Sequence, residues 1–256
     1  LLPGSVGECY EFAGAAFDLA ERLQTPVFVL SDLDLGMNNY MSEPFAYPDQ
    51  ALDRGKVLDD AALAKVAKFE RYRDVDGDGI PYRTLPGTKD WKGAYFTRGS
   101  GHDEAARYTE SPEAYVRVLD RLRRKHEGAR DLVPKPVLLE SPGAEIGLIA
   151  FGSSDGAVLE ARDQLKAQGI GTSYLRVRAL PFHESVAAFV LKHPRVYVVE
   201  QNRDGQLTDK VRLEVPERAA DVKAVLHYLG LPLDARSVTD GVLAHEKHLV
   251  AQGVTR

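Results

Sequence analysis

The sequence His102-Asp103-Glu104 is the group of side chains best suited to proton chemistry in this chain of 256 residues. A histidine titrates near neutral pH, and a neighbouring carboxylate can hold its charge or its tautomer. Glycines at positions 99 and 101 precede the group and give the loop freedom to bend. We therefore predict His102 and Asp103 as catalytic residues. The alternative is a solvated loop that anchors itself by side-chain hydrogen bonds.

A second set of polar side chains, Asp32, Asp34 and Asn38, follows the apolar run at residues 27–30. A continuous apolar run predicts a strand that is buried on both faces, as in a parallel sheet. Open α/β sheets bind their ligands at the carboxyl ends of such strands. These three residues are therefore predicted to bind a cofactor. The alternative is turn chemistry, in which Asp and Asn side chains cap backbone amides after a strand.

Residues 74–79 match the first half of a calcium-binding loop, with carboxylates at Asp74, Asp76 and Asp78 and a turn at Gly79. Such a loop needs a bidentate carboxylate at its twelfth position, which is Leu85 here. The sequence therefore favours an acidic turn over a calcium site, and we predict no metal on this chain.

The elements that must position these residues follow from the apolar spacing. Apolar residues at 12, 16, 19 and 23 recur near helical spacing, so a helix precedes the predicted strand. A short helix is expected around 59–72, and the Gly- and Pro-rich residues 71–110 form an ordered connecting loop. Ser111 as N-cap and Pro112 at the first helical position predict a helix over 111–125.

The second half of the chain alternates strands with helices. Strands are expected at 146–151, 173–177 and 195–200, which predicts βαβ units and a parallel sheet. The tail from 219 is expected to form a helix, a strand-like piece at 231–233 and a last helix from about 237. The predicted fold class is α/β, with two parallel-sheet domains.

The composition argues against nucleic-acid-binding and membrane-spanning proteins. The chain has 44% hydrophobic residues and a formal net charge of -5, with acids and bases scattered along it. It carries no basic footprint for nucleic acid, and its longest apolar runs are well short of the roughly 20 residues that span a bilayer. The single cysteine, Cys9, cannot form an internal disulfide or hold a four-thiolate cluster by itself. We therefore expect a soluble protein in a reducing, cytoplasmic setting.

Three segments, in this order, carry a resemblance to a known family. They are SVGECYEFAGAAFDLAERLQTPVFVLSDLDLGMN, the loop DGIPYRTLPG leading to GSGHDEAARYTE, and the strand end VYVVEQNRDGQL. In order and spacing they resemble the α subunit of the 2-oxoacid:ferredoxin oxidoreductases, particularly the 2-oxoglutarate branch. The resemblance covers nearly all of the chain.

The resemblance implies a domain organisation. Residues 1–98 would form the second half of a pyrimidine-type thiamin-diphosphate-binding domain with an excursion, 99–135 a loop, helix and linker, and 136–256 a transketolase C-terminal-like domain. The chain would be the C-terminal portion of a longer polypeptide, with the family's substrate arginine and aminopyrimidine contacts upstream of Leu1. By the same resemblance, Asp103 lies in a loop near the active-site cleft and influences which 2-oxoacid is accepted.

The resemblance also implies an activity, which is the oxidative decarboxylation of 2-oxoglutarate or pyruvate with coenzyme A and ferredoxin. Thiamin pyrophosphate with Mg²⁺ and a [4Fe–4S] cluster would be held mostly by a partner β subunit, in a dimer of αβ units. The isolated chain is then expected to be inactive and to carry no cofactor. The alternatives are a non-catalytic scaffold or assembly fragment, and a transketolase or 2-oxoacid dehydrogenase subunit without ferredoxin.

Overall fold

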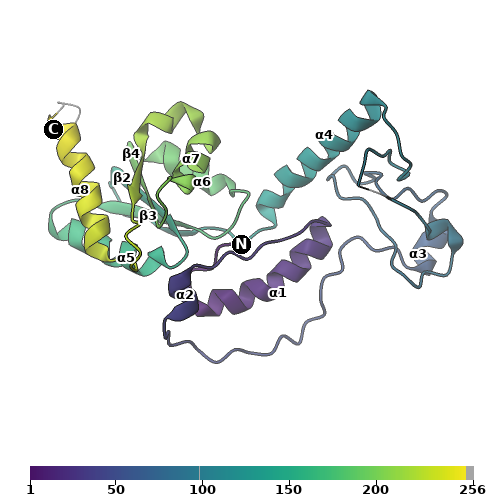
Figure 1. Cartoon of the computed structure of the whole chain (residues 1–256), viewed down its shortest axis with the longest axis horizontal. Helices are drawn as coiled ribbons and strands as arrows, with labels where there is room; N and C mark the ends of the chain where they lie inside the picture. Colours follow the sequence, from purple (N-terminus) through teal and green to yellow (C-terminus); the bar gives the residue numbers. More distant parts are fainter. Residues whose placement is uncertain (98, 252–256) are drawn as a thin grey trace. The chain divides into compact units, whose positions relative to one another are not determined.

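A computed structural model of the chain describes residues 1–97 and 99–251 (Figure 1). The chain divides into two compact units. Unit 1 comprises Leu1–Ala13, Val29–Ala46 and the chain from Val133 onward, and unit 2 comprises Gly14–Phe28 and Tyr47–Leu132. Helix α1 (Val6–Leu23) contributes residues to both units.

Unit 1 is built on a five-stranded sheet with the strand order β1-β3-β2-β4-β5. Strand β1 is antiparallel to β3, and the other neighbouring strands are parallel. The predicted strands at 146–151, 173–177 and 195–200 are confirmed as β2, β3 and β4. The bounds are β1 (Val137–Leu139), β2 (Ile146–Phe151), β3 (Thr172–Val177), β4 (Arg195–Glu200) and β5 (Val222–Leu226).

Helices cover both faces of this sheet (Figure 1). Strand side chains alternate between the two faces, so Ile149 lies in one core and its neighbour Leu148 in the other. Burial on both faces explains why β2 and β4 read as continuous apolar runs. One face carries α6 (Glu184–Lys192) and α7 (Gln206–Glu214), and the other carries α5 (Ser154–Ala167) and α8 (Ala235–Ala251).

The tail after α7 differs from the prediction. Residues 222–226 form strand β5 instead of a helix, and residues 231–233 form no strand. Strand β5 pairs with β4 along its whole length, so an edge of the existing sheet supplies its hydrogen bonds. The last helix begins at Ala235, close to its predicted start.

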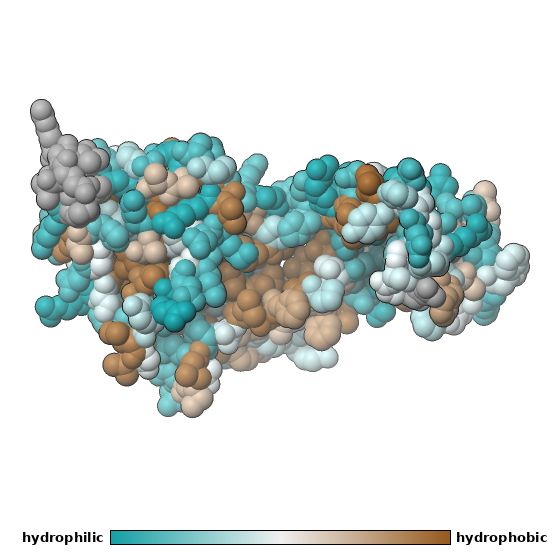
Figure 2. Space-filling view, turned by 45° about the horizontal axis from the view of Figure 1, so that its top comes forward, coloured by the Kyte–Doolittle hydropathy of each residue, from teal (hydrophilic) through white to brown (hydrophobic). Residues whose placement is uncertain are grey.

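The prediction of a buried parallel strand at 27–30 is wrong. This segment is extended but belongs to no sheet of the described chain. Phe28 is 71% exposed and Leu30 is 60% exposed, and both contribute to the apolar surface, of which Figure 2 shows part in brown. A strand needs a hydrogen-bonded neighbour as well as apolar side chains, and the apolar run alone does not supply one.

Unit 2 consists mainly of loops that are held by short helices and by α4 (Pro112–Gly128). Ser111 caps α4 as predicted, because its Oγ accepts a hydrogen bond from the Ala114 N–H at 3.3 Å. The helix predicted around 59–72 is shorter, since α3 (Asp60–Lys65) ends where Val66 becomes extended. Of the apolar residues expected on that helix, Leu63 is fully buried, so packing supports little more than one turn. No helix among the residues described is long and apolar enough to cross a membrane.

Candidate functional site

The loop that carries the predicted catalytic residues forms a small hairpin in unit 2. The Thr109 N–H donates to the Gly101 carbonyl oxygen at 3.1 Å, and the Asp103 N–H donates to the Arg107 carbonyl oxygen at 2.9 Å. A Cβ on Gly101 would lie 2.7 Å from the Thr109 oxygen, so only glycine fits at this close approach. The turn also holds Ala106 in the left-handed region, with φ at 69°. The hairpin is therefore a defined structure despite its loop-like sequence.

The carboxylate of Asp103 holds the turn of this hairpin. Its Oδ1 accepts hydrogen bonds from the N–H groups of Ala105 and Arg107, both at 2.9 Å. The Ala106 N–H donates to the Asp103 backbone oxygen at 3.1 Å. These bonds match the anchoring role that the sequence left open beside the catalytic one.

The imidazole of His102 is held by ring stacking. Its centroid lies 4.0 Å from that of Tyr72, with 22° between the ring planes. The Nδ1 atom is 3.0 Å from the backbone oxygen of Asp103, and because a carbonyl only accepts, Nδ1 carries the hydrogen in this geometry. This leaves Nε2 as the basic nitrogen. His102 and Tyr115 line a hollow of about 340 Å³, where an imidazole could exchange a proton with a ligand.

Glu104, the third member of the sequence group, is engaged in an ion pair. Its Oε1 lies 2.8 Å from Nε of Arg117 on α4, and this hydrogen bond lowers the pKa of Glu104. The Glu104 backbone oxygen accepts the Tyr72 N–H at 2.8 Å. Glu104 therefore fastens the hairpin to α4 and to the segment that carries the stacking tyrosine.

The predicted cofactor-binding residues lie in unit 1, around helix α2 (Leu33–Met37). Asp32 is the N-cap of α2, and its Oδ1 accepts the Leu35 N–H at 2.9 Å. Its Oδ2 accepts the Ser153 N–H at 2.8 Å, at the turn between β2 and α5. Asp32 thus lies at the carboxyl end of a parallel strand, as expected, but that strand is β2 and not residues 27–30.

Asp34 and Asn38 are likewise engaged within the chain. The Tyr40 hydroxyl donates to Asp34 Oδ2 at 2.8 Å, and this bond raises the pKa of Tyr40. Asn38 Oδ1 accepts the Asn39 N–H at 2.9 Å. These contacts do not fit a cradle for thiamin pyrophosphate, because the polar atoms that would have to face the cofactor already serve caps and turns.

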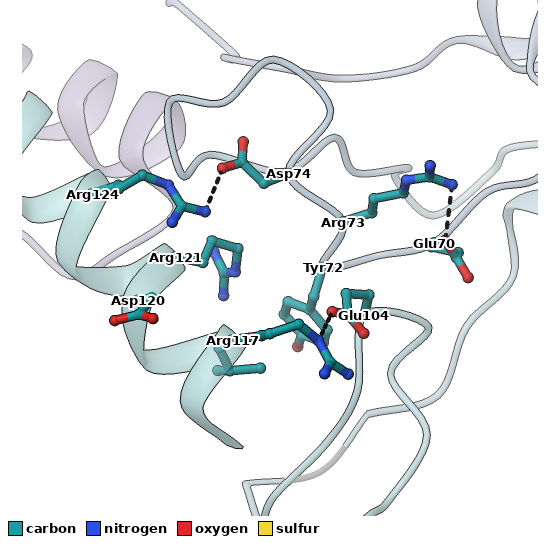
Figure 3. Close-up of a pocket in the computed structure, with 10 residues that line it drawn as sticks. Glu70, Tyr72, Arg73, Asp74, Glu104, Arg117, Asp120, Arg121 and Arg124 are labelled. Atoms are coloured by element: carbon teal, nitrogen blue, oxygen red, sulfur yellow. Dashed lines mark hydrogen bonds and ion pairs between the residues drawn. The ribbon is translucent and has the colours of Figure 1, made fainter. Parts of the chain in front are cut away.

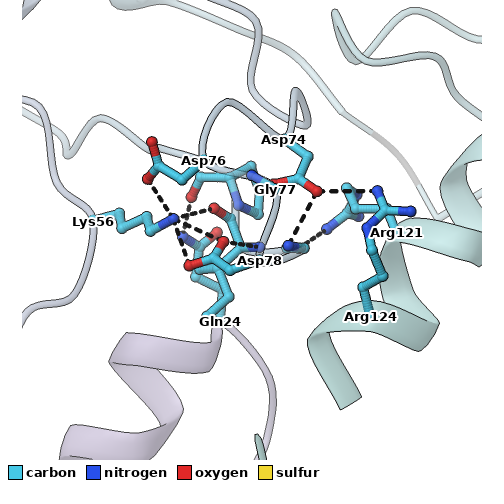
Figure 4. Close-up of polar contacts among 11 residues, drawn as sticks. Gln24, Lys56, Asp74, Asp76, Gly77, Asp78, Arg121 and Arg124 are labelled. Carbon is cyan, nitrogen blue, oxygen red and sulfur yellow. Dashed lines mark hydrogen bonds and ion pairs between the residues drawn. The ribbon is translucent and has the colours of Figure 1, made fainter. Parts of the chain in front are cut away.

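The acidic turn at 74–79 is neutralised by cations from other segments (Figure 4). Lys56 Nζ lies 2.6 Å from Asp76 and 2.8 Å from Asp78. Burial alone would lower the pKa of Lys56, but its bonds to the two carboxylates outweigh burial and raise it. Asp74 pairs with Arg124 at 3.0 Å. The carboxylates that a calcium ion would need are therefore in ion pairs, and no metal-ligating cluster occurs among the residues described.

Comparison with known proteins shows what the chain is similar to. No family model matches it. The 2-oxoacid:ferredoxin oxidoreductase 2 subunit alpha of Aeropyrum pernix is 32% identical over 219 residues, which is 83% of this chain and 33% of that protein. The oxidoreductase 1 subunit alpha of the same organism is 30% identical over 246 residues, or 92% of this chain and 36% of that protein. Over most of its length, the chain is similar to α subunits of the 2-oxoacid:ferredoxin oxidoreductases.

A third relative is the 2-oxoglutarate synthase subunit KorA of Methanothermobacter marburgensis, 28% identical over 221 residues. That alignment covers 83% of this chain and 54% of KorA, so the chain spans about a third to a half of the relatives it matches. Among solved structures, the 2-oxoglutarate:ferredoxin oxidoreductase from Magnetococcus marinus, with 2-oxoglutarate, coenzyme A and succinyl-CoA bound, matches with a TM-score of 0.78. At 23% identity over 94% of this chain and 41% of that one, this match confirms the predicted α/β fold.

The sequence did not indicate that Tyr72 and Arg121 belong beside the His102 hairpin. Tyr72 stands in the Gly- and Pro-rich segment that is predicted as a connecting loop, and Arg121 stands near the end of the helix predicted over 111–125. The Arg121 guanidinium lies 5.8 Å from the Tyr72 ring centroid. No spacing rule connects these positions, because they lie on separate segments that meet only in the folded unit.

Proposed function

We propose that the chain is part of a 2-oxoacid:ferredoxin oxidoreductase, an enzyme that decarboxylates 2-oxoglutarate or pyruvate with coenzyme A and passes the electrons to ferredoxin. The observation that carries this proposal is the identity of 32% and 30% to two named α subunits, over 83% and 92% of the chain. In the complete enzyme, thiamin pyrophosphate with Mg²⁺ and a [4Fe–4S] cluster supply the chemistry of carbon–carbon cleavage and electron transfer.

The cofactors are assigned mainly to a partner β subunit, in a dimer of αβ units. The engagement of Asp32 and Asp34 in caps and turns supports this assignment, because their oxygens already accept hydrogen bonds within the chain. In this proposal, residues 1–98 belong to a pyrimidine-type domain, 99–135 to a loop, helix and linker, and 136–256 to a transketolase C-terminal-like domain. A cytoplasmic location fits such an enzyme.

The hairpin would be this chain's contribution to the reaction site. His102 carries its hydrogen on Nδ1, so Nε2 is the ring atom that would exchange a proton in the reaction site. With a proton on Nε2, the ring would donate a hydrogen bond to a carboxylate or keto oxygen of the 2-oxoacid. Asp103 would position this ring through its backbone oxygen and the turn that it caps. Its charge would then influence which 2-oxoacid is accepted.

The test uses the purified complex that contains this chain. We expect 2-oxoacid-dependent and coenzyme A-dependent reduction of viologen, and no turnover by the isolated chain. His102→Gln should lower kcat/KM by about a hundredfold or more, the lower end of the range for a lost acid–base group. His126→Gln is the matched control, since His126 is exposed on α4. A complex that assembles but reduces no dye with pyruvate or 2-oxoglutarate would refute the oxidoreductase and favour an assembly module.

A further inference from the structure

A second hollow in unit 2 lies between α4 and the segment that carries Tyr72 (Figure 3). Its volume is about 440 Å³, which is ample for a small ligand. Four arginines line it, and Tyr72 and Val118 are shared with the hollow at His102. The arginines are Arg73, Arg117, Arg121 and Arg124.

All of these arginines but one have a carboxylate partner (Figure 3). The remaining carboxylate of the lining, Asp120, lies 3.8 Å from Arg123, which is outside the hollow. The acidic side chains are therefore already compensated. The three pairs are Arg73–Glu70 at 3.3 Å, Arg117–Glu104 at 2.8 Å and Arg124–Asp74 at 3.0 Å.

Arg121 is the exception. It is only 7% exposed, and its Nη1 donates to the Gly79 backbone oxygen at 2.9 Å. Its Nε is buried without a hydrogen-bond partner, and no ion pair within the described chain involves this guanidinium. In Figure 3 it lies between Arg117 and Arg124 with no dashed contact to the other residues drawn. A buried charge in this state is unfavourable unless an anion compensates it.

Two further cations increase the positive charge around Arg121. The Arg71 guanidinium lies 4.9 Å from the Tyr72 ring centroid, and its Nε and Nη1 are buried without partners. Lys125 Nζ donates to the Gln24 backbone oxygen at 3.4 Å. Burial, and then the charge of Arg71, lower the pKa of Arg121, while burial and the charges of Arg121 and Arg71 lower the pKa of Lys125. The charge of Asp74, which pairs with Arg124, acts on the pKa of Arg121 in the opposite direction, but less than burial does. Among the residues described, Arg121 therefore has no carboxylate in direct contact.

We propose that this hollow is an oxyanion-binding site, which takes the phosphoryl or carboxylate group of a small ligand with Arg121 as the central contact. A planar guanidinium donates hydrogen bonds in a fork that matches such groups, and the paired Arg117 and Arg124 flank it. The site is distinct from the polar edge at Asp32 and does not depend on the proposed reaction. The bound anion neutralises a buried cation that would otherwise be unpaired.

Calorimetric titration of the full chain with inorganic phosphate, and separately with glutarate, at constant ionic strength tests the site. We expect saturable binding of at least one anion with a dissociation constant of about 1 mM or lower. Arg121→Gln should weaken that binding by at least about tenfold, because charge-assisted hydrogen bonds are lost. Lys65→Gln is the control and should leave binding unchanged, since it removes the same charge at an exposed position of α3 outside the hollow.

A second variant, which is expected to bind anions more tightly, distinguishes the loss of a contact in Arg121→Gln from a loss of structure. Glu104→Gln removes the carboxylate that neutralises Arg117, so anion affinity should rise several-fold, which a misfolded chain could not produce. Binding of phosphate alone would identify a phosphoryl site, and binding of glutarate alone a carboxylate site. Lack of saturable binding of both anions by the unmodified chain, or equal weakening by Arg121→Gln and Lys65→Gln, would overturn the proposal.

Discussion

Replacement of Asp103 separates the role of its oxygen atoms from the role of its charge. Asp103→Ala removes the Oδ1 atom that accepts the amides of Ala105 and Arg107, each at 2.9 Å. Loss of a side chain that caps backbone amides costs about 0.5–2 kcal/mol, and two bonds at a half-buried position place this change near about 1–2 kcal/mol. Asp103→Asn keeps an oxygen that can accept both bonds, so we expect stability within about 0.5 kcal/mol of the unmodified chain.

Amide hydrogen exchange of Ala105 and Arg107 is the most direct assay, with urea unfolding beside it. In Asp103→Ala these amides should exchange about 5–30-fold faster, because a loss of about 1–2 kcal/mol changes a local opening equilibrium by that factor. In Asp103→Asn their exchange should change little. Unchanged exchange in Asp103→Ala, or equal damage by both variants, would refute the conclusion that the carboxylate oxygen holds the turn.

The same pair of variants tests substrate selection in the complete complex. If the charge of Asp103 selects the 2-oxoacid, Asp103→Asn should change the ratio of kcat/KM values for pyruvate, 2-oxobutyrate and 2-oxoglutarate while it unfolds like the unmodified protein. Equal ratios in Asp103→Asn and the unmodified complex would leave Asp103 as a positioning residue for the hairpin.

Three further outcomes follow from buried carboxylates in unit 1. Glu8→Gln should lower the free energy of unfolding in urea by about 3 kcal/mol, because the Glu8 carboxylate binds Arg176 at 2.6 and 2.9 Å and Arg178 at 2.8 Å. A decrease of less than about 1 kcal/mol would contradict this prediction. Burial would raise the pKa of Glu8, but the bond from Arg176 lowers it below the ordinary 4.5, so its contribution to stability is present above that pH and disappears as the pH falls below it. The difference in urea midpoint between the unmodified chain and Glu8→Gln should therefore be large at pH 7 and smaller at about pH 3. Glu200→Ala should lower the free energy of unfolding by about 3 kcal/mol or more, since this fully buried carboxylate accepts hydrogen bonds from the amides of Leu207 and Thr208 at 2.8 and 3.0 Å. A urea midpoint close to that of the unmodified chain would show that other contacts hold the start of α7.

Much of the fold could be predicted because its signals are local. Ser111 and Pro112 predict the start of α4, since capping depends on atoms within the first helical turn. The apolar runs of β2 and β4 predict strands that are buried on both faces, and the helices between them predict parallel pairing. The family motifs were also readable in the sequence, because they are short segments whose order along the chain carries the resemblance.

Residues 27–30 show where local signals end. Their apolar run resembles that of β4, yet it is exposed, because a strand forms only where another strand offers hydrogen bonds. Residues 222–226 show the converse, since the neighbouring β4 makes a strand of a segment whose sequence favoured a helix. Whether a pairing partner lies alongside depends on distant parts of the chain and cannot be seen in a window of neighbouring residues.

The sequence by itself therefore determined the class of fold, the capped helices and the residue types that could do chemistry. Only the tertiary structure decided what those residues do: Asp32 reaches the amide of Ser153, 121 positions away, and His102 stacks on Tyr72. Arg121 is set apart from the other arginines of its helix by burial without a carboxylate partner. The physical reason is that helix capping is settled by adjacent residues, whereas burial, ion pairing and the approach of two segments depend on the packing of the whole unit.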